Sequence, residues 1–152
     1  GVKWHSAAET KKLLAMMSKV NLDKVEEARR LSKESGQIQV GTIYKRTRRE
    51  HGSKLQRAEV RFDDTAGCLR TPAGGSSRQL VIIIKGGKVR SRLISSRETA
   101  RLMGLPDEYR LPEKYNEAYH LTGDGVVVPV VRHLAEHLFL PLLAQSSKEV
   151  AA

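Results

Sequence analysis

Residues 80–94 read LVIIIKGGKVRSRLI and carry the clearest structural signal in this chain of 152 residues. The first five are apolar and mostly β-branched, which is typical of a buried strand. Gly86 and Gly87 have the form of a two-residue hairpin turn, and the chain returns from Lys88 to Ile94. The stretch therefore predicts an antiparallel β-hairpin.

A second pair of strands is predicted upstream of this hairpin. Val40, Ile43 and Tyr44 supply apolar positions for one strand, and apolar residues alternate with charged ones over 58–62. The polar segment 48–54 is expected to connect the two strands. Residues 37–94 are therefore expected to form one β-rich region.

Helices are predicted before this region. Ser6 and Glu9 have the spacing of a capping box, which predicts a helix over about 7–18. Asn21 is expected to cap a second helix, through about residue 33, that Gly36 ends.

Helices are also predicted after it. The capping-box spacing of Ser95 and Glu98 predicts a short helix that Gly104 ends, and a second short helix is expected near 113–121. Pro129 suits the first turn of a longer helix reaching about residue 143. The fold class is therefore α+β, with a helical segment over 1–36, the β-rich domain over 37–94, a helical segment over 95–144 and a frayed tail over 145–152.

The positive charge is concentrated in the middle of the chain. There are 27 Lys and Arg against 17 Asp and Glu, a formal net charge of +10. Residues 45–97 hold 14 cations and 4 acids, whereas the two flanks cancel, and 65–97 has seven cations and no acid. Such a field attracts a polyanion, so it favours nucleic-acid binding, with a merely solvated basic surface as the alternative.

Other site chemistries receive little support from the sequence. The single cysteine, Cys68, excludes an internal disulfide, fits a reducing cytoplasm and is expected to be a small buried residue rather than a nucleophile. His133 and His137 are four apart, but the polar face of an amphipathic helix explains them better than a metal does. Uninterrupted apolar runs such as 126–131 are far below the roughly 20 residues of a membrane span, so no membrane partner is expected.

The loop over residues 69–79 has the composition of a DNA-reading segment. It lacks acids and contains residue types that contact phosphates or base edges, with glycines that allow close approach of the backbone. A flexible surface loop is the alternative. The residues expected to read bases are Arg70, Thr71, Gly74, Gly75, Arg78 and Gln79, and those expected to contact phosphates are Arg46, Arg48, Lys88 and Arg90.

Two stretches resemble conserved motifs of the DNA cytosine-5 methyltransferases. Residues 91–109, SRLISSRETARLMGLPDEY, are similar to the ninth motif of that family. Residues 119–131, YHLTGDGVVVPVV, are similar to the tenth. The resemblance covers about residues 37–143 and implies that the basic β region is the target recognition domain, which reads duplex DNA.

The resemblance also implies roles for residues outside the β region. The stretch similar to the ninth motif would dock the recognition domain on the catalytic domain through Arg97, Glu98 and Arg101. Its tenth motif would line part of an S-adenosylmethionine pocket with Gly123, Asp124, Gly125 and Val126, and the helices after it would complete a Rossmann-like methyltransferase domain. The family usually has Asn at position 124 and Ala or Ser at 125, and a carboxylate at 124 can only accept hydrogen bonds.

The resemblance does not extend to the catalytic motifs. Neither the Pro-Cys nucleophile motif nor the glycine-rich cofactor loop is present in this chain, and Cys68 does not follow a proline. The chain, which begins with Gly, is expected to be a fragment or the smaller subunit of a split bacterial enzyme, associated with the nucleoid and inactive alone. The alternatives are a stand-alone basic module that binds DNA or RNA and a purely structural interaction domain.

The last predicted helix has a wide apolar face that would pack on the missing catalytic part. Without that cover, the chain is expected to self-associate through residues 126–143 or to fold the helix back onto the N-terminal helices. The face consists of Val127, Val130, Val131, Leu134, Leu138 and Leu142. The N-terminal surface would consist of Leu13, Leu14, Met17 and Leu22.

Overall fold

The computed structural model describes residues 2–50, 52–71 and 78–150, with side chains described for all of these except residues 50 and 146–150. The chain divides into two compact units, Gly1–Ser95 and Ser96–Ala152. The N-terminal helices and the sheet share the first unit.

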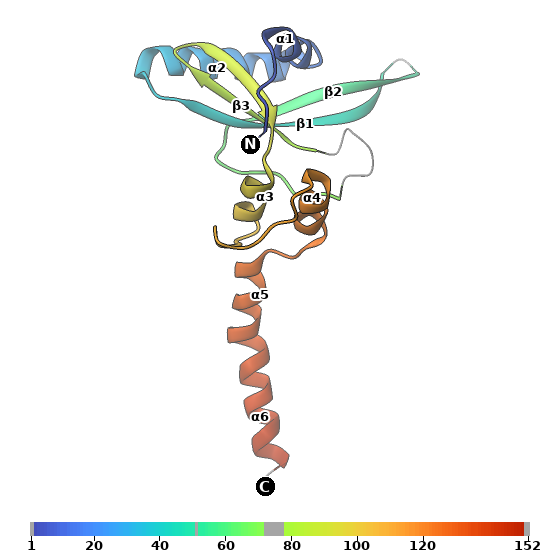
Figure 1. Cartoon of the computed structure of the whole chain (residues 1–152), viewed down its shortest axis with the longest axis vertical. Coiled ribbons are helices and arrows are strands. Elements are labelled where there is room, and N and C mark those ends of the chain that lie inside the picture. The colour runs from blue at the N-terminus through green and yellow to red at the C-terminus, as the bar shows by residue number, and fades with distance from the viewer. Residues whose placement is uncertain (1, 51, 72–77, 151–152) are drawn as a thin grey trace. The chain divides into compact units, whose positions relative to one another are not determined.

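The first unit is built on a four-stranded antiparallel sheet with the order β2-β1-β3-β4 (Figure 1). Its strands are β1 (Gln39–Glu50), β2 (Ser53–Arg61), β3 (Leu80–Lys85) and β4 (Lys88–Leu93). The predicted hairpin is confirmed as β3 and β4. Gly86 and Gly87 turn it with φ angles of 54° and 77°, a region that favours glycine.

Strands β1 and β2 are longer than the sequence predicts. The segment 48–54 was expected to be a connection, yet Arg48 pairs with Leu55 and Arg49 pairs with Lys54. That prediction is wrong because polar side chains are compatible with a strand that water surrounds.

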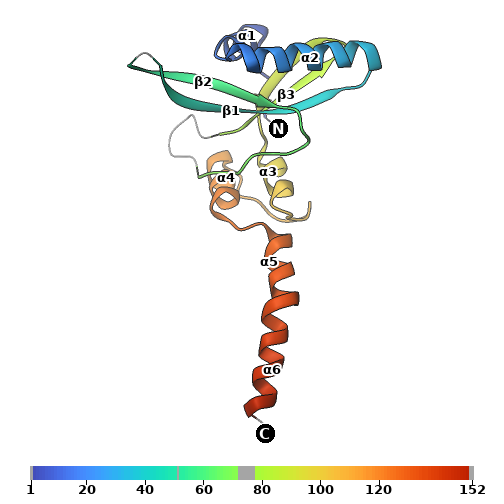
Figure 2. The same ribbon diagram turned by 180° about the vertical axis from the view of Figure 1, so that it is seen from behind.

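Two helices cover one face of this sheet, α1 (Ala7–Ala15) and α2 (Lys19–Ser35), as Figures 1 and 2 show. The capping box is confirmed, since Glu9 N–H donates to the Ser6 side chain and Ser6 N–H donates to the Glu9 carboxylate. Between helices and sheet lies the core, formed by Leu13, Met17, Val25, Ala28, Ile43, Ala58, Val60, Leu80, Ile82 and Ile84.

The start of α2 differs from the prediction, although its end does not. Ser18, rather than Asn21, is the N-cap, because the helix resumes almost directly after α1. Asn21 lies inside α2, where its Oδ1 accepts from Val60 N–H at 2.9 Å and so ties the helix to β2. Gly36 ends the helix in a left-handed conformation, as predicted.

The second unit is helical. Its elements are α3 (Ser96–Leu102), α4 (Tyr115–Asp124), α5 (Val128–Leu134), the π-helical η1 (Ala135–Phe139) and α6 (Leu140–Val150). Helices α3 and α4 pack through buried side chains, and the Thr122 hydroxyl donates to that of Thr99 at 3.1 Å. Helix α6 continues to Val150, past the predicted helix end near 143.

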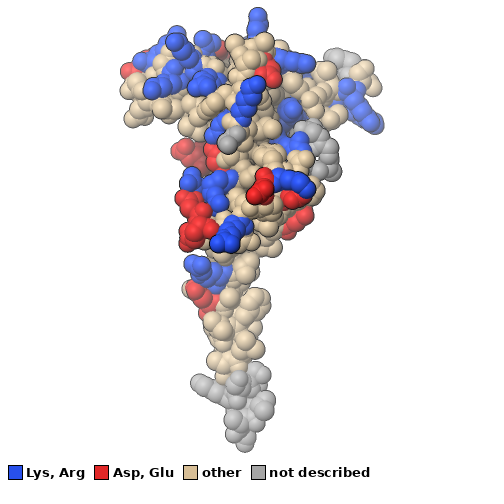
Figure 3. Space-filling model, viewed as in Figure 1, with Lys and Arg blue, Asp and Glu red and all other residues tan. Residues whose placement is uncertain are grey.

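The continuous helix of α5, η1 and α6 exposes apolar side chains on all sides. On the face seen in Figure 3, the part of this helix that is not grey is mostly tan, in contrast to the blue Lys and Arg of the first unit. The short apolar runs of the sequence predict no membrane span, yet the helical segment Tyr115–Gln145 contains an 18-residue window with a mean hydropathy of 1.5. By length and composition, this segment could cross a membrane. One such segment is weak evidence of a span.

Candidate nucleic-acid interface

Most cations of the strands lie on the face of the sheet that α1 and α2 do not cover. Side chains alternate along a strand, so the core positions of Ile43, Val60 and Ile82 place their sequence neighbours on the other face. We call this surface the cationic face. Its cations are Arg46, Arg48, Arg57, Arg61, Lys85, Lys88, Arg90 and Arg92.

Part of this face belongs to a β-ribbon that extends beyond the rest of the sheet (Figure 1). Strand β1 pairs with β3 only over 39–43, so residues 44–50 pair with 53–59 of β2 alone. We call this two-stranded part the β-ribbon. Its cations are Lys45, Arg46, Arg48, Arg49, Lys54 and Arg57. A two-stranded ribbon is narrow enough to enter the major groove of B-DNA.

One carboxylate holds two arginines of the β-ribbon in place. Glu59 accepts from Arg48 Nε at 3.0 Å and also from its Nη2, and Arg46 Nε lies 3.5 Å from the same carboxylate. One acid facing two cations leaves this cluster positively charged. Glu59 is not among the residues predicted from the sequence, although its strand alternation with Ala58 and Val60, which are buried, was a usable signal.

The predicted base-reading loop is partly structural. Gln79 is only 1% exposed, and its amide nitrogen donates to the carbonyls of Gly67 and Cys68 at 2.9 and 3.0 Å. A side chain this deeply buried does not fit a contact with DNA bases. Gln79 is therefore not kept among the residues expected to read bases. Gln79 instead fixes the loop that follows β2.

The other residues predicted for this loop have different positions. Arg70 is exposed, whereas Thr71 and Arg78 are half-buried. Gly74 and Gly75 lie outside the described residues. Of the residues expected to contact phosphates, Arg46, Arg48, Lys88 and Arg90 are all exposed.

Cys68 is exposed, contrary to the prediction that it is buried. The next residue, Leu69, takes the buried position instead, at 8% exposed. Gly67 packs so closely against Tyr44 that an added Cβ would lie 1.2 Å from the tyrosine oxygen. The loop therefore lies against β1 with Gly67 inward, and the thiol of exposed Cys68 donates to the Leu69 carbonyl at 3.2 Å.

A cavity of about 560 Å³ brings this loop together with β1, β2 and α2. Arg46, which is predicted to contact phosphates, and Arg70, which is predicted to read bases, both line this cavity. Asp63 lies in the same wall, and hydrogen bonds from Arg61 and then Thr65 hold the pKa of its carboxyl far below the ordinary value. Arg61 donates to it from Nε at 2.9 Å, so the acid is already engaged by a cation.

Arg97 and Arg101 stabilise the turn after α3 within the second unit. Arg97 donates to the carbonyls of Tyr109 and Pro106 at 2.8 and 3.3 Å. Arg101 forms a two-point ion pair with Asp107 at 2.7 and 2.8 Å, which lowers the pKa of that carboxyl. Glu98 is half-buried.

The four residues expected near a cofactor lie at the end of α4. Gly123 and Asp124 form its last turn, Gly125 ends it, and Val126 is 67% exposed. An added Cβ at Gly125 would lie 3.0 Å from the Leu121 carbonyl oxygen, so packing against α4 explains this glycine. Three of the four are exposed and Gly123 is half-buried, which is compatible with lining the edge of a larger pocket.

No metal site is found among the residues that the structure describes. The rings of His133 and His137 stack with centroids 4.3 Å apart. Their helical spacing therefore brings the rings together, but no third ligand accompanies them in this part of the chain.

Comparisons with known proteins agree with these features. The sequence model of the family "C-5 cytosine-specific DNA methylase" matches residues 3–140. The chain is 39% identical over 70 residues to Type II methyltransferase M.NlaX of Neisseria lactamica, covering 46% of this chain and 22% of that protein. It is 31% identical over 101 residues to DNA (cytosine-5)-methyltransferase CMT2 of Oryza sativa subsp. japonica, covering 66% and 7%.

A third relative is Type II methyltransferase M.MspI of Moraxella sp, 36% identical over 59 residues, with 39% of this chain and 14% of that protein covered. The chain thus spans less than a quarter of the length of each of these relatives. No solved structure matches the chain. Since the family model matches almost the whole chain, the chain belongs to the C-5 cytosine-specific DNA methylases.

Proposed function

We propose that this chain is the DNA-recognition and C-terminal part of a cytoplasmic DNA cytosine-5 methyltransferase that uses S-adenosylmethionine. The observation that carries the proposal is the gathering of eight cations on one face of the sheet, within the region that the family model matches. Phosphate contacts dominate the affinity of proteins for duplex DNA, and such a face can supply them.

The roles proposed for individual residues follow from their charge and their exposure to solvent. Arg46, Arg48, Lys88 and Arg90 would contact phosphates and fix the orientation of the duplex. Arg70, Thr71 and Arg78 would read base edges, together with the backbone at Gly74 and Gly75. The β-ribbon supports this arrangement because its width suits the major groove, where base pairs are distinguishable.

The second unit would join the recognition domain to the catalytic part. Arg97 and Arg101 already brace the turn after α3, and with Glu98 they would present it to the catalytic domain. The exposed apolar side chains of α5, η1 and α6 would pack against that domain, which accounts for their composition better than a membrane does. Gly123, Asp124, Gly125 and Val126 would form one edge of the cofactor pocket.

Methyl transfer would depend on residues outside this chain. S-adenosylmethionine, when bound, supplies the methyl group, and a catalytic cysteine of the missing part would attack the cytosine ring. The residues of this chain would hold the DNA in register while that happens. The required partner is therefore a catalytic domain, either on the same polypeptide or as a separate subunit.

A salt titration of DNA binding tests the proposal. Each neutralised phosphate contributes about −0.9 to the slope of log K against log salt, so we expect roughly −3 or steeper. A slope near zero would exclude the nucleic-acid interface. Labelled methyl groups should reach DNA only when the catalytic part is supplied, and failure in its presence would favour a stand-alone DNA- or RNA-binding module.

A further inference from the structure

The N-terminal segment is fastened to the edge strand of the sheet. His5 N–H donates to the Ser91 carbonyl at 2.9 Å, and the His5 ring contacts the Ser91 hydroxyl at 2.9 Å. Ser91 is buried and also bonds the Thr10 hydroxyl of α1 at 3.0 Å. Trp4 forms an antiparallel bridge with Arg92. These contacts fix the position of Trp4 beside β4.

The indole of Trp4 contacts two cations of the cationic face. The Arg90 guanidinium carbon lies 4.2 Å from the ring centroid, and that of Arg92 lies 5.1 Å from it. Arg90 and Arg92 are two residues apart on β4, so their side chains leave the same side of the strand. Two adjacent guanidiniums repel, and the negative face of an indole offsets that repulsion.

We propose that Trp4 is a positioning residue of the DNA interface, holding Arg90 and Arg92 so that both guanidiniums meet phosphates of the DNA backbone. This inference rests on the proposed function and adds the N-terminal segment to the DNA interface. Trp4 is not among the residues assigned to DNA above, and Arg92 is named there only as a member of the cationic face.

The geometry of a guanidinium allows both contacts at once. Stacking on an aromatic ring uses the flat face of the group, whereas phosphate oxygens accept hydrogen bonds from the N–H donors at its edge. A stacked arginine also has fewer rotamers to lose when it binds. The indole therefore prepares the two arginines without neutralising either charge.

Trp4 is the only tryptophan in the chain, so its emission reports directly on this cluster. Duplex DNA should change the emission of the full chain with the same midpoint as the anisotropy of a labelled duplex. The change should shrink in the Arg90→Gln, Arg92→Gln double variant. DNA binding seen by anisotropy, with the Trp4 emission unchanged, would overturn the proposal and leave the proposed function intact.

Substitution provides a second readout. Trp4→Ala should weaken DNA binding about two- to fivefold, the range of an exposed cation–π contact, with an unchanged salt slope because no charge is lost. Trp4→Phe keeps an aromatic face and should retain most of the affinity. Val20→Ala, a charge-neutral truncation of an exposed residue on α2, is the matched control.

The outcomes separate the two proposals. Folded Trp4→Ala protein that binds DNA like the wild type would contradict the positioning role alone. Wild-type chain that binds no DNA at any salt concentration would contradict the proposed function itself. If Trp4→Ala does not fold, as judged by its thermal melt, the emission titration of the wild type decides.

Discussion

Glu59 sets how much of the positive charge of the β-ribbon is available. It engages Arg46 and Arg48 together, so Glu59→Gln should release two cations toward DNA. We expect affinity for duplex DNA to rise about two- to tenfold, with a steeper salt slope. Binding isotherms at several salt concentrations measure both quantities.

Glu26→Gln is the matched control for this change. It removes the same charge from α2, where Glu26 pairs with Arg29 at 2.9 Å on the helical side of the sheet. A smaller effect is expected there. Equal gains from the two variants would mean that net charge matters and the position of Glu59 does not.

Asp63 should make stability depend on pH in the acid range. The pKa of its carboxyl is lowered in the folded chain by Arg61 and Thr65, so ionised Asp63 favours folding above its ordinary pKa of about 4. That contribution is lost as pH falls below about 4 toward the lower pKa of the folded state. Thermal melts should show Asp63→Asn less stable than wild type at neutral pH, with the difference disappearing in acid.

The same thermal melts at neutral and acid pH, carried out on Asp23→Asn, serve for comparison, because Asp23 pairs with Lys19 on the surface of α2. A constant difference between wild type and Asp63→Asn from neutral pH down to strong acid would contradict the assignment.

Local sequence signals located charges and turns, but they did not establish which side chains are buried. The positions of Arg46 and Arg90 follow from strand alternation once one core residue is known. Gln79 and Cys68 follow no such rule, because their exposure depends on how the loop after β2 lies against β1. That contact joins residues distant in sequence, and no local pattern contains it.

Ser32 connects helix α2 to the β3–β4 hairpin. Its buried hydroxyl donates to the Ile84 carbonyl at 3.1 Å and accepts from Gly86 N–H at 3.0 Å. Ser32→Ala removes both hydrogen bonds, one of them buried, and should cost about 1–3 kcal/mol of unfolding free energy. Urea denaturation measures the loss.

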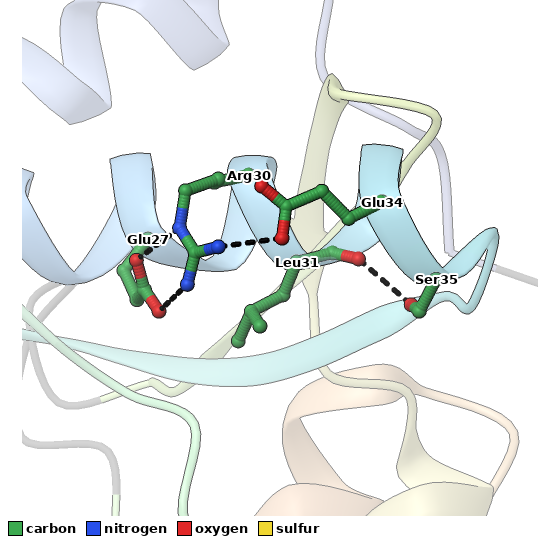
Figure 4. A network of polar contacts seen from close by, with 5 residues as sticks. All are labelled: Glu27, Arg30, Leu31, Glu34 and Ser35. Atoms are coloured by element: carbon green, nitrogen blue, oxygen red, sulfur yellow. Dashed lines mark hydrogen bonds and ion pairs between the residues drawn. The ribbon is translucent and has the colours of Figure 1, made fainter.

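Ser35→Ala on the same helix makes the same chemical change at an exposed position. Its hydroxyl donates to the Leu31 carbonyl one turn earlier and accepts from Gln37 N–H, both at the exposed end of the helix. It lies near the ion pairs of Arg30 with Glu27 and Glu34 (Figure 4). A change of at most about 0.5 kcal/mol is expected. Similar losses for both serines would mean that the link from α2 to the hairpin contributes little.

Elements with strong local chemistry were predictable, whereas their ends often were not. The glycine pair of the hairpin, the Ser6 capping box and the Gly36 terminator each satisfy backbone groups nearby, so sequence alone identifies them. The ends of β1 and the start of α2 depend on pairing with distant segments. Asn21 resembles a cap, yet its side chain is used to bind β2.

The packing of the first unit occupies part of the surface that was expected to cover the apolar C-terminal helix. Leu13 and Met17 are buried in the core against the sheet, whereas Leu14 is half-buried and Leu22 is 37% exposed. This loss of half the surface favours self-association over folding back, which stays a prediction.

Self-association is therefore expected when the chain is alone. Leu134 is 41% exposed, and Leu134→Glu should convert an oligomer into a monomer, as measured by light scattering. His133→Glu adds the same side chain at the neighbouring polar position and should leave the oligomer intact. A monomeric wild type that is unaffected by Leu134→Glu would contradict this use of the helix.

The β-ribbon has a further consequence for the behaviour of the protein in solution. Beyond residue 43 no third strand among the described residues flanks it, although Ala58 N–H at one edge donates to the Met16 carbonyl at 3.0 Å. The outer part of the ribbon therefore has edges that can pair with another chain. Its six cations keep two such edges apart by repulsion, and concentrated salt screens that repulsion. Salt at a concentration that would release the proposed DNA partner would therefore also weaken the protection of the protein against aggregation.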